Sequence, residues 1–257
     1  MFNILAVGDV VGSRGCEFLD AHLRAVKRFY KADLTIVNGE NSAPGNGITK
    51  KSAESLFLAG ADIITTGNHV FARQESYDYL DEAPYVVRPA NYHKDCPGKG
   101  AAVWDAGRFT VMVANLAGTV FMESLDNPFL TADRLLKEYT DCRIKVIDFH
   151  AETTSEKCAM AYYLDGRASV LFGTHTHVQT NDECIYPGGL GYITDVGMTG
   201  AQFSALGVDP APVVDKFIYK MPRKFVTSEN PIVMDIAVFG VDEATGKTVE
   251  VLKERIR

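Results

Sequence analysis

Residues 170–177 read Val-Leu-Phe-Gly-Thr-His-Thr-His: an apolar run, a glycine, and then two histidines two positions apart. Side chains at that spacing lie on the same side of a strand, and on the turn after a strand they can converge on one point. Imidazole is the commonest protein ligand for transition metals. Two half-buried histidines with ordinary hydrogen-bond partners would give the same pattern, so His175 and His177 alone leave both interpretations open.

Other apolar, β-prone runs end in the same kind of residue. Residues 2–9, 34–41, 63–69 and 143–150 close on Asp9, on Glu40 and Asn41, on Asn68 and His69, and on His150. In open α/β sheets, binding sites form in the crevice outside the carboxyl ends of the strands. Each group alone is explained as well by a helix cap or a turn. Their joint occurrence predicts one site at one sheet edge.

Between these runs, apolar residues recur at helical spacing. This spacing predicts helices over about 13–31, 49–59, 127–139 and 153–163, with Ser13 as an N-cap and Thr153 with Glu156 as a capping box. The alternation through residue 83 indicates a mostly parallel sheet with crossover helices. Segments 85–88, 100–104 and 109–116 then predict strands without intervening helices. A short helix over 211–220 and a hairpin over 232–257 complete the chain.

Composition excludes several classes of protein. The chain has 257 residues, 46% hydrophobic and 23% charged, with a net charge of -7 that argues against stable nucleic-acid binding. No apolar stretch reaches the ~20 residues that a membrane span needs. The pattern at the N-terminus predicts a strand rather than a signal peptide. Five scattered cysteines without a C-x-x-C pair argue against disulfides and a zinc knuckle. We expect one cytoplasmic domain over residues 1–257.

The mixture of donors selects a kind of metal. Carboxylates, amide oxygens and imidazoles without a thiolate suit Fe, Mn, Zn, Co or Ni better than Ca²⁺ or Mg²⁺. Six or seven ligands are too many for one tetrahedral ion, whereas two ions about 3.5–4 Å apart that share a carboxylate would use them all. Such a pair lowers the pKa of a bridging water and holds a phosphoryl oxygen, which is chemistry for phosphate-ester hydrolysis.

Five motifs carry a resemblance to a known family. Gly-Asp-Val-Val-Gly at 8–12, Asn-Gly-Glu-Asn at 38–41, Thr-Gly-Asn-His at 66–69, His150 and Gly-Thr-His-Thr-His at 173–177 resemble the motif blocks of the calcineurin-like metallophosphoesterases. The bacterial YmdB-type branch is the more similar one, over essentially the whole chain. Val11 replaces the superfamily's usual histidine, Glu40 its usual aspartate, and Val70 an acid.

The resemblance implies an α/β fold, a four-layer α/β/β/α sandwich, with two divalent or trivalent ions, Fe or Mn first. Asp9, Glu40, Asn41 and His177 would hold one ion. Glu40 would bridge, and Asn68, His150 and His175 would complete the other. His69 would protonate the leaving group while the metal-bridging hydroxide attacks a small phosphodiester, a 2′,3′- or 3′,5′-cyclic nucleotide. A homo-oligomer is also implied.

Two other functions compete with this interpretation. A metal-dependent amidohydrolase also carries H-x-H, but on the first strand of its barrel, whereas here the motif lies two-thirds along the chain. A metal-bound regulatory protein that signals by binding a partner fits the same residues with little turnover. Asp148 is a candidate to orient a ligand imidazole, although a carboxylate at a sheet end is an equally good explanation. Asp195 follows a strand and is a weaker candidate to line the rim of the pocket.

Overall fold

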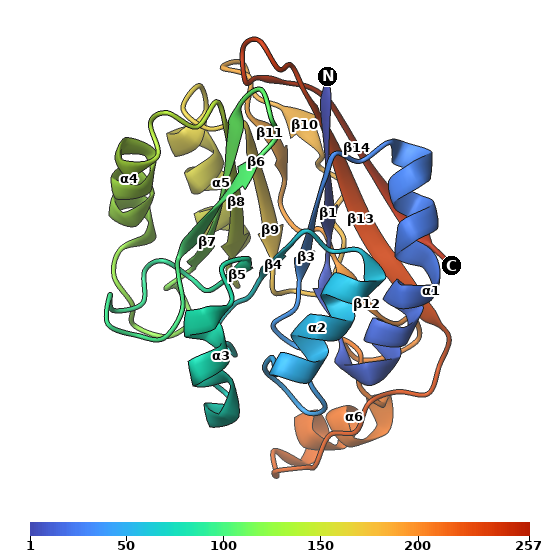
Figure 1. Cartoon of the computed structure of the whole chain (residues 1–257). Helices are drawn as coiled ribbons and strands as arrows, with labels where there is room; N and C mark the ends of the chain where they lie inside the picture. Colours follow the sequence, from blue (N-terminus) through green and yellow to red (C-terminus); the bar gives the residue numbers. More distant parts are fainter.

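Two β-sheets form the middle of the molecule. The computed structural model describes residues 1–257. The strands of the first sheet are β1 (Phe2–Val7), β2 (Asp9–Val10), β3 (Leu34–Asn38), β4 (Ile63–Thr65), β5 (Val86–Val87), β12 (Met198–Ala201), β13 (Ile232–Val241) and β14 (Thr248–Ile256). The second sheet holds β6 (Ala101–Asp105), β7 (Thr110–Ala117), β8 (Ile144–His150), β9 (Val170–Thr174), β10 (Cys184–Ile185) and β11 (Gly191–Ile193). Figure 1 shows the two sheets side by side in the centre of the fold.

The strand order confirms the mostly parallel arrangement. The first sheet runs β2-β12-β13-β1-β3-β4-β5, with β14 paired to β13, and β1, β3, β4 and β5 are parallel neighbours. The second sheet runs β10-β11-β9-β8-β7-β6, and β7, β8, β9 and β11 are parallel. The predicted helix-free strands are β5, β6 and β7, where the chain passes from the first sheet to the second. The final hairpin is the antiparallel pair β13–β14.

Helices cover both outer faces. They are α1 (Gly12–Tyr30), α2 (Lys50–Ala59), the one-turn η1 (Gln74–Ser76), α3 (Tyr77–Glu82), α4 (Pro128–Glu138), α5 (Thr154–Leu164) and α6 (Pro210–Tyr219). None combines the length and the apolar run that a bilayer crossing needs. In Figure 1, α1 and α2 lie beside the first sheet, and α4 and α5 lie beside the second. The predicted four-layer α/β/β/α sandwich is confirmed.

The alternation of side chains between the two faces of each strand explains why the helices and the two sheets pack as layers. In β1, Leu5 and Val7 belong to the apolar cluster under α1 and α2, whereas Ile4 and Ala6 belong to the cluster between the sheets. Successive side chains of a strand point to opposite faces, so an apolar run without polar breaks buries both faces. A third cluster fills the space between the second sheet and helices α4 and α5.

Two predicted caps are wrong. Val11 is the cap residue of α1, so Ser13 lies inside the first turn. Thr153 precedes α5, but its side chain makes no capping bond. Glu156 instead accepts hydrogen bonds from the backbone N (3.0 Å) and the hydroxyl (3.2 Å) of Thr119, because it faces the loop after β7.

Phe239 gives a test of the core between the sheets. Its side chain is fully buried in β13, with its ring centroid 6.4 Å from that of Phe172. We expect Phe239→Ala to lower the free energy of unfolding by ~3–5 kcal/mol, because it removes buried contacts and leaves a cavity. Urea denaturation measures the change. Phe217→Ala on α6, where the side chain is 66% exposed, is the matched control and should change stability by less than about 0.5 kcal/mol. Equal losses in the two variants would contradict this packing.

Candidate metal centre

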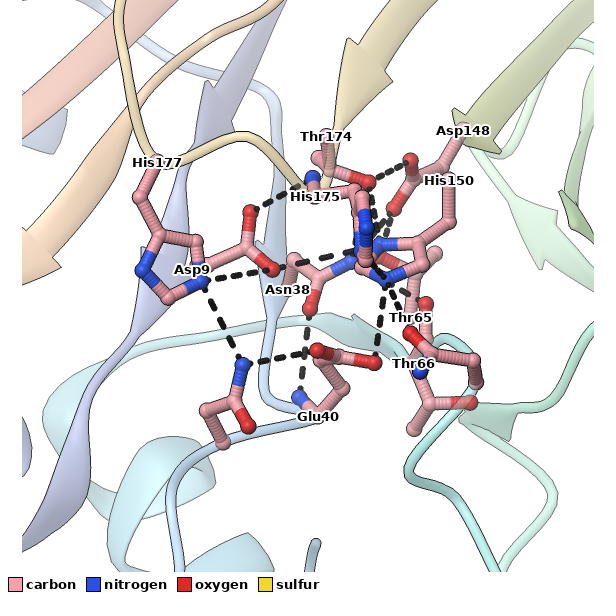
Figure 2. A network of polar contacts seen from close by, with 12 residues as sticks. Asp9, Asn38, Glu40, Thr65, Thr66, Asp148, His150, Thr174, His175 and His177 are labelled. Carbon is pink, nitrogen blue, oxygen red and sulfur yellow. Dashed lines mark hydrogen bonds and ion pairs between the residues drawn. The ribbon is translucent and has the colours of Figure 1, made fainter. Parts of the chain in front are cut away.

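The residues predicted to share a site meet at one edge of the two sheets. Asp9 begins β2, separated from the end of β1 by one residue; Glu40 and Asn41 follow β3, and Asn68 and His69 follow β4. From the second sheet, His150 is the last residue of β8, and His175 and His177 follow β9. Figure 2 shows Asp9, Glu40, His150, His175 and His177 turned toward one another. Donor atoms of Glu40, His150 and His175 lie within 4.8 Å of one another, and so do those of Asp9, Glu40 and His177.

The first group surrounds His150. Its Nε2 lies 3.0 Å from Glu40 Oε2, 3.0 Å from Asn68 Oδ1 and 3.0 Å from His175 Nδ1. Burial alone would lower the pKa of His150, but the attraction and hydrogen bond of Glu40, with the charge of Asp9, outweigh burial and raise it to about 9. Two ring nitrogens, a carboxylate and an amide oxygen therefore face one point. A cation there would replace the imidazole proton.

Asp9 lies at the centre of the second group. Its Oδ1 lies 3.8 Å from His177 Nε2, and its Oδ2 accepts a hydrogen bond of 3.2 Å from the backbone N of His175. Oδ1 is buried without any hydrogen-bond partner, and burial raises the pKa of this carboxyl. An isolated buried carboxylate oxygen is costly, and a metal ion would satisfy it. The residues present therefore fit a bound cation.

Asn41 differs from the expectation in one detail. Its Nδ2 donates to Glu40 Oε1 at 2.7 Å and lies 3.4 Å from His177 Nε2, while its Oδ1 lies 3.1 Å from His69 Nδ1. The amide nitrogen, not the oxygen, therefore faces the donor groups. A half-turn of the amide exchanges the two atoms without moving the backbone, and only that orientation would present the oxygen to a metal ion.

A polar network behind His150 fixes its ring. Thr174 Oγ1 donates to Asp148 Oδ1 at 2.7 Å, so its oxygen accepts from Nδ1 of His150 at 2.8 Å. That bond leaves Nε2 facing the donor group. Asn38 and Thr65, both in the first sheet, donate to Asp148 Oδ2 (Figure 2). Asp148, suggested by the sequence as an orienting group, is thus connected to the His150 ring through the Thr174 hydroxyl.

Glu152 is a residue that the sequence analysis missed. Its Oε2 lies 3.0 Å from His175 Nε2, on the side of the ring away from His150. A carboxylate on one ring nitrogen orients a histidine whose other nitrogen binds metal. Burial, helped by the charge of His150, lowers the pKa of His175 to about 3 and keeps the ring neutral. Its position two residues after His150 was the available signal.

His69 lies at the open side of the group. Its Nδ1 is 3.0 Å from Glu40 Oε1, and this hydrogen bond raises the pKa of the imidazole. The side chain is 33% exposed and lines a cavity of about 320 Å³, together with Glu152, His175 and His177 from the second sheet and Leu206 and Thr227 from later in the chain. That volume accommodates a small molecule.

Two packed sheets with carboxylate, amide and imidazole donors at their common edge define the metallophosphoesterase class. A 5′-nucleotidase from Thermus thermophilus shares the fold, at 12% identity and a TM-score of 0.57 over 99% of this chain and 54% of that one. The chain belongs to the YmdB-like protein family, whose model matches residues 5–254.

Two relatives match almost the whole chain. A Bacillus subtilis protein named 2′,3′-cyclic-nucleotide 2′-phosphodiesterase is 45% identical over 255 residues, which cover 99% of this chain and 96% of that protein. The solved structure of a novel phosphatase from Mycoplasma pneumoniae is 35% identical, with a TM-score of 0.94 over 99% of this chain and 93% of that one.

Gly67 allows the β4 turn to approach the donor groups. A Cβ atom at this position would overlap Glu40 Oε2 and His150 Nε2. We expect Gly67→Ala to weaken Mn²⁺ binding and to lower stability by about 1–3 kcal/mol, as overpacking does. Isothermal titration calorimetry and urea denaturation measure the two effects. The control Gly107→Ala lies in a turn where an added Cβ meets no atom within 4 Å. Gly107→Ala should lower stability without changing the affinity for Mn²⁺. Unchanged Mn²⁺ affinity in Gly67→Ala would contradict the geometry.

Proposed function

We propose that this chain is a metal-dependent phosphodiesterase that hydrolyses small phosphodiesters, with 2′,3′-cyclic nucleotides as the first substrate class. The main support is the pair of three-residue donor groups that have Glu40 in common. A shared carboxylate between two sets of donors is what a two-metal site requires. The name of the Bacillus subtilis relative supports the substrate class.

The donor groups indicate which residues would hold each ion. Asp9, Glu40 and His177, with Asn41 after its amide turns, would hold one; Glu40, Asn68, His150 and His175 would hold the other. Nitrogen and oxygen donors without sulfur suit Fe or Mn, with Zn, Co and Ni as further candidates. Two such ions, when bound, supply Lewis-acid stabilisation of phosphoryl oxygens and lower the pKa of water at the site.

His69 is the residue of this chain proposed to move a proton. Its Nδ1 contacts Glu40 and Asn41, which fixes the ring, and the side chain lines the cavity. A ring held through Nδ1 presents Nε2 to a substrate, where it can donate a proton to the leaving oxygen. Proton donation by a positioned side chain accelerates such reactions by ~10²–10⁴-fold.

Metal stoichiometry tests the two-ion proposal. After loading with Mn²⁺ and gel filtration, elemental analysis should find two ions per chain in the unmodified protein. Because Glu40 belongs to both groups, Glu40→Gln should retain fewer than one, whereas His177→Ala should retain one. Glu54→Gln, on the exposed face of α2, is the control and should retain two. Full retention by Glu40→Gln would refute the shared carboxylate.

Leaving-group dependence tests the role of His69. We expect His69→Ala to lower kcat for 2′,3′-cyclic AMP by ~10²–10⁴-fold with unchanged metal content. The loss should be smaller for bis-p-nitrophenyl phosphate, because p-nitrophenolate leaves without protonation. His93→Ala, whose side chain is 71% exposed, is the control.

Either of two results would contradict these assignments. Equal losses on both substrates would remove His69 from the acid role. Absence of turnover by the unmodified protein with every first-row metal would favour the regulatory-protein alternative over the phosphodiesterase.

A further inference from the structure

The backbone that carries the two histidines after β9 is in an unfavourable conformation. His175 has φ 101° and His177 has φ 61°, in the left-handed region that residues with a Cβ rarely adopt. Such conformations persist only where the surroundings impose them, and they concentrate at functional sites. One contact on this backbone comes from a donor group, because Asp9 Oδ2 accepts from the backbone N of His175 at 3.2 Å. Two further contacts come from residues outside the donor groups.

A buried ion pair lies directly behind this segment. Lys157, on α5, is fully buried, and its Nζ donates to Asp195 Oδ2 at 2.8 Å and to the carbonyl oxygen of Thr174 at 2.8 Å. Asp195 Oδ2 also accepts from the backbone N of Thr176 at 3.1 Å. The peptide groups on both sides of His175 are thus bonded to one ion pair.

Packing around the lysine is equally specific. A Cβ atom on Gly173 would lie 2.9 Å from Lys157 Cδ and would overlap the carbonyl oxygen of Thr194. The lysine stem therefore passes close over the end of β9, where only glycine leaves room. Asp195 is held in turn, because its Oδ1 accepts from the backbone N of Gly197 at 2.9 Å. Each member of the pair is therefore bonded both to its partner and to the backbone of residues 174–176.

We infer that Lys157 and Asp195 are positioning residues, which hold residues 174–177 so that the imidazoles of His175 and His177 face Glu40 and Asp9 before a metal ion binds. This inference rests on the proposed two-metal function. It assigns a role to two side chains that are not themselves metal ligands. A lysine is seldom fully buried unless it is paired, and here the pairing serves the histidine segment.

The double variant Lys157→Met/Asp195→Asn removes both charges together, so neither is left buried and unpaired. Calorimetric titration of the metal-free protein should show Mn²⁺ affinity weakened by roughly 10–100-fold, as for other residues that orient ligands. Lys27→Met/Asp62→Asn is the control, because it also removes both charges of a lysine–aspartate pair. Lys27 has the same pattern of partners, Asp62 Oδ2 at 2.9 Å and the Gly60 carbonyl at 2.7 Å, and neither it nor Asp62 belongs to the donor groups. The control's Mn²⁺ affinity should stay within twofold of the unmodified protein.

Two outcomes separate a positioning pair from a purely structural one. If the double variant loses stability in urea but binds Mn²⁺ within twofold of the unmodified protein, the inference is wrong. If the unmodified protein itself binds no Mn²⁺, the proposed function fails. That result differs from a loss of Mn²⁺ affinity in the double variant alone.

Hydrogen exchange tests the inference first in the unmodified protein, where no variant has to fold. In the metal-free unmodified protein, the amide of Thr176 should exchange slowly, because its partner is Asp195 and not a metal-dependent contact. Its exchange should quicken in Asp195→Asn. Rapid exchange in the metal-free unmodified protein would show that the segment is not held before metal binds, and would overturn the inference.

Discussion

Buried negative charge is the constraint on which the rest of this structure depends. Asp9, Glu40, Asp148 and Asp195 are all buried at one edge of the sandwich. Three of them have close side-chain partners: Asp195 pairs with a lysine, Asp148 accepts from hydroxyl and amide groups, and Glu40 faces two imidazoles. Asp9 accepts one backbone hydrogen bond at Oδ2, but its Oδ1 has no hydrogen-bond partner. An uncompensated carboxylate in a low-dielectric interior is costly enough that the group either binds a proton or attracts a cation.

Neither sheet alone could build this edge. Within the two donor groups, the first sheet supplies the carboxylates and the second supplies the imidazoles, so these groups form only where the sheets pack against each other. Asn38 and Asp148 show the connection: their side chains are 110 residues apart in the chain and 3.0 Å apart in space. The apolar contacts between the sheets hold the layers together, and this polar contact fixes their alignment at the edge where the ligand strands end. A shift of one sheet past the other would separate the two kinds of donor.

The sequence predicted the strands that end at the site well, because apolar runs buried on both faces leave a strong signal and because the candidate ligands follow those runs directly. It failed where side chains act over a distance. Thr153 and Glu156 have the spacing of a capping box, yet Glu156 turns to the Thr119 loop, a contact that tertiary packing decides. The strand Met198–Ala201 was missed because it is short and follows no helix. Glu152 was missed because its one local signal, the position two residues after His150, does not by itself indicate a contact with His175.

Lys157 illustrates why such residues escape a reading of the sequence. A lysine on a helix is ordinarily a surface residue, and the chain around it gives no contrary sign. Its burial follows from the strained backbone it supports: His175 at φ 101° needs its neighbouring peptide groups fixed from behind, and an apolar side chain could not bond to the Thr174 carbonyl. Lys157 departs from the usual exposure of lysine, and the backbone next to its Thr174 contact departs from the usual φ range. Violations that coincide in space are explained by a shared function, whereas unrelated defects would be scattered through the fold.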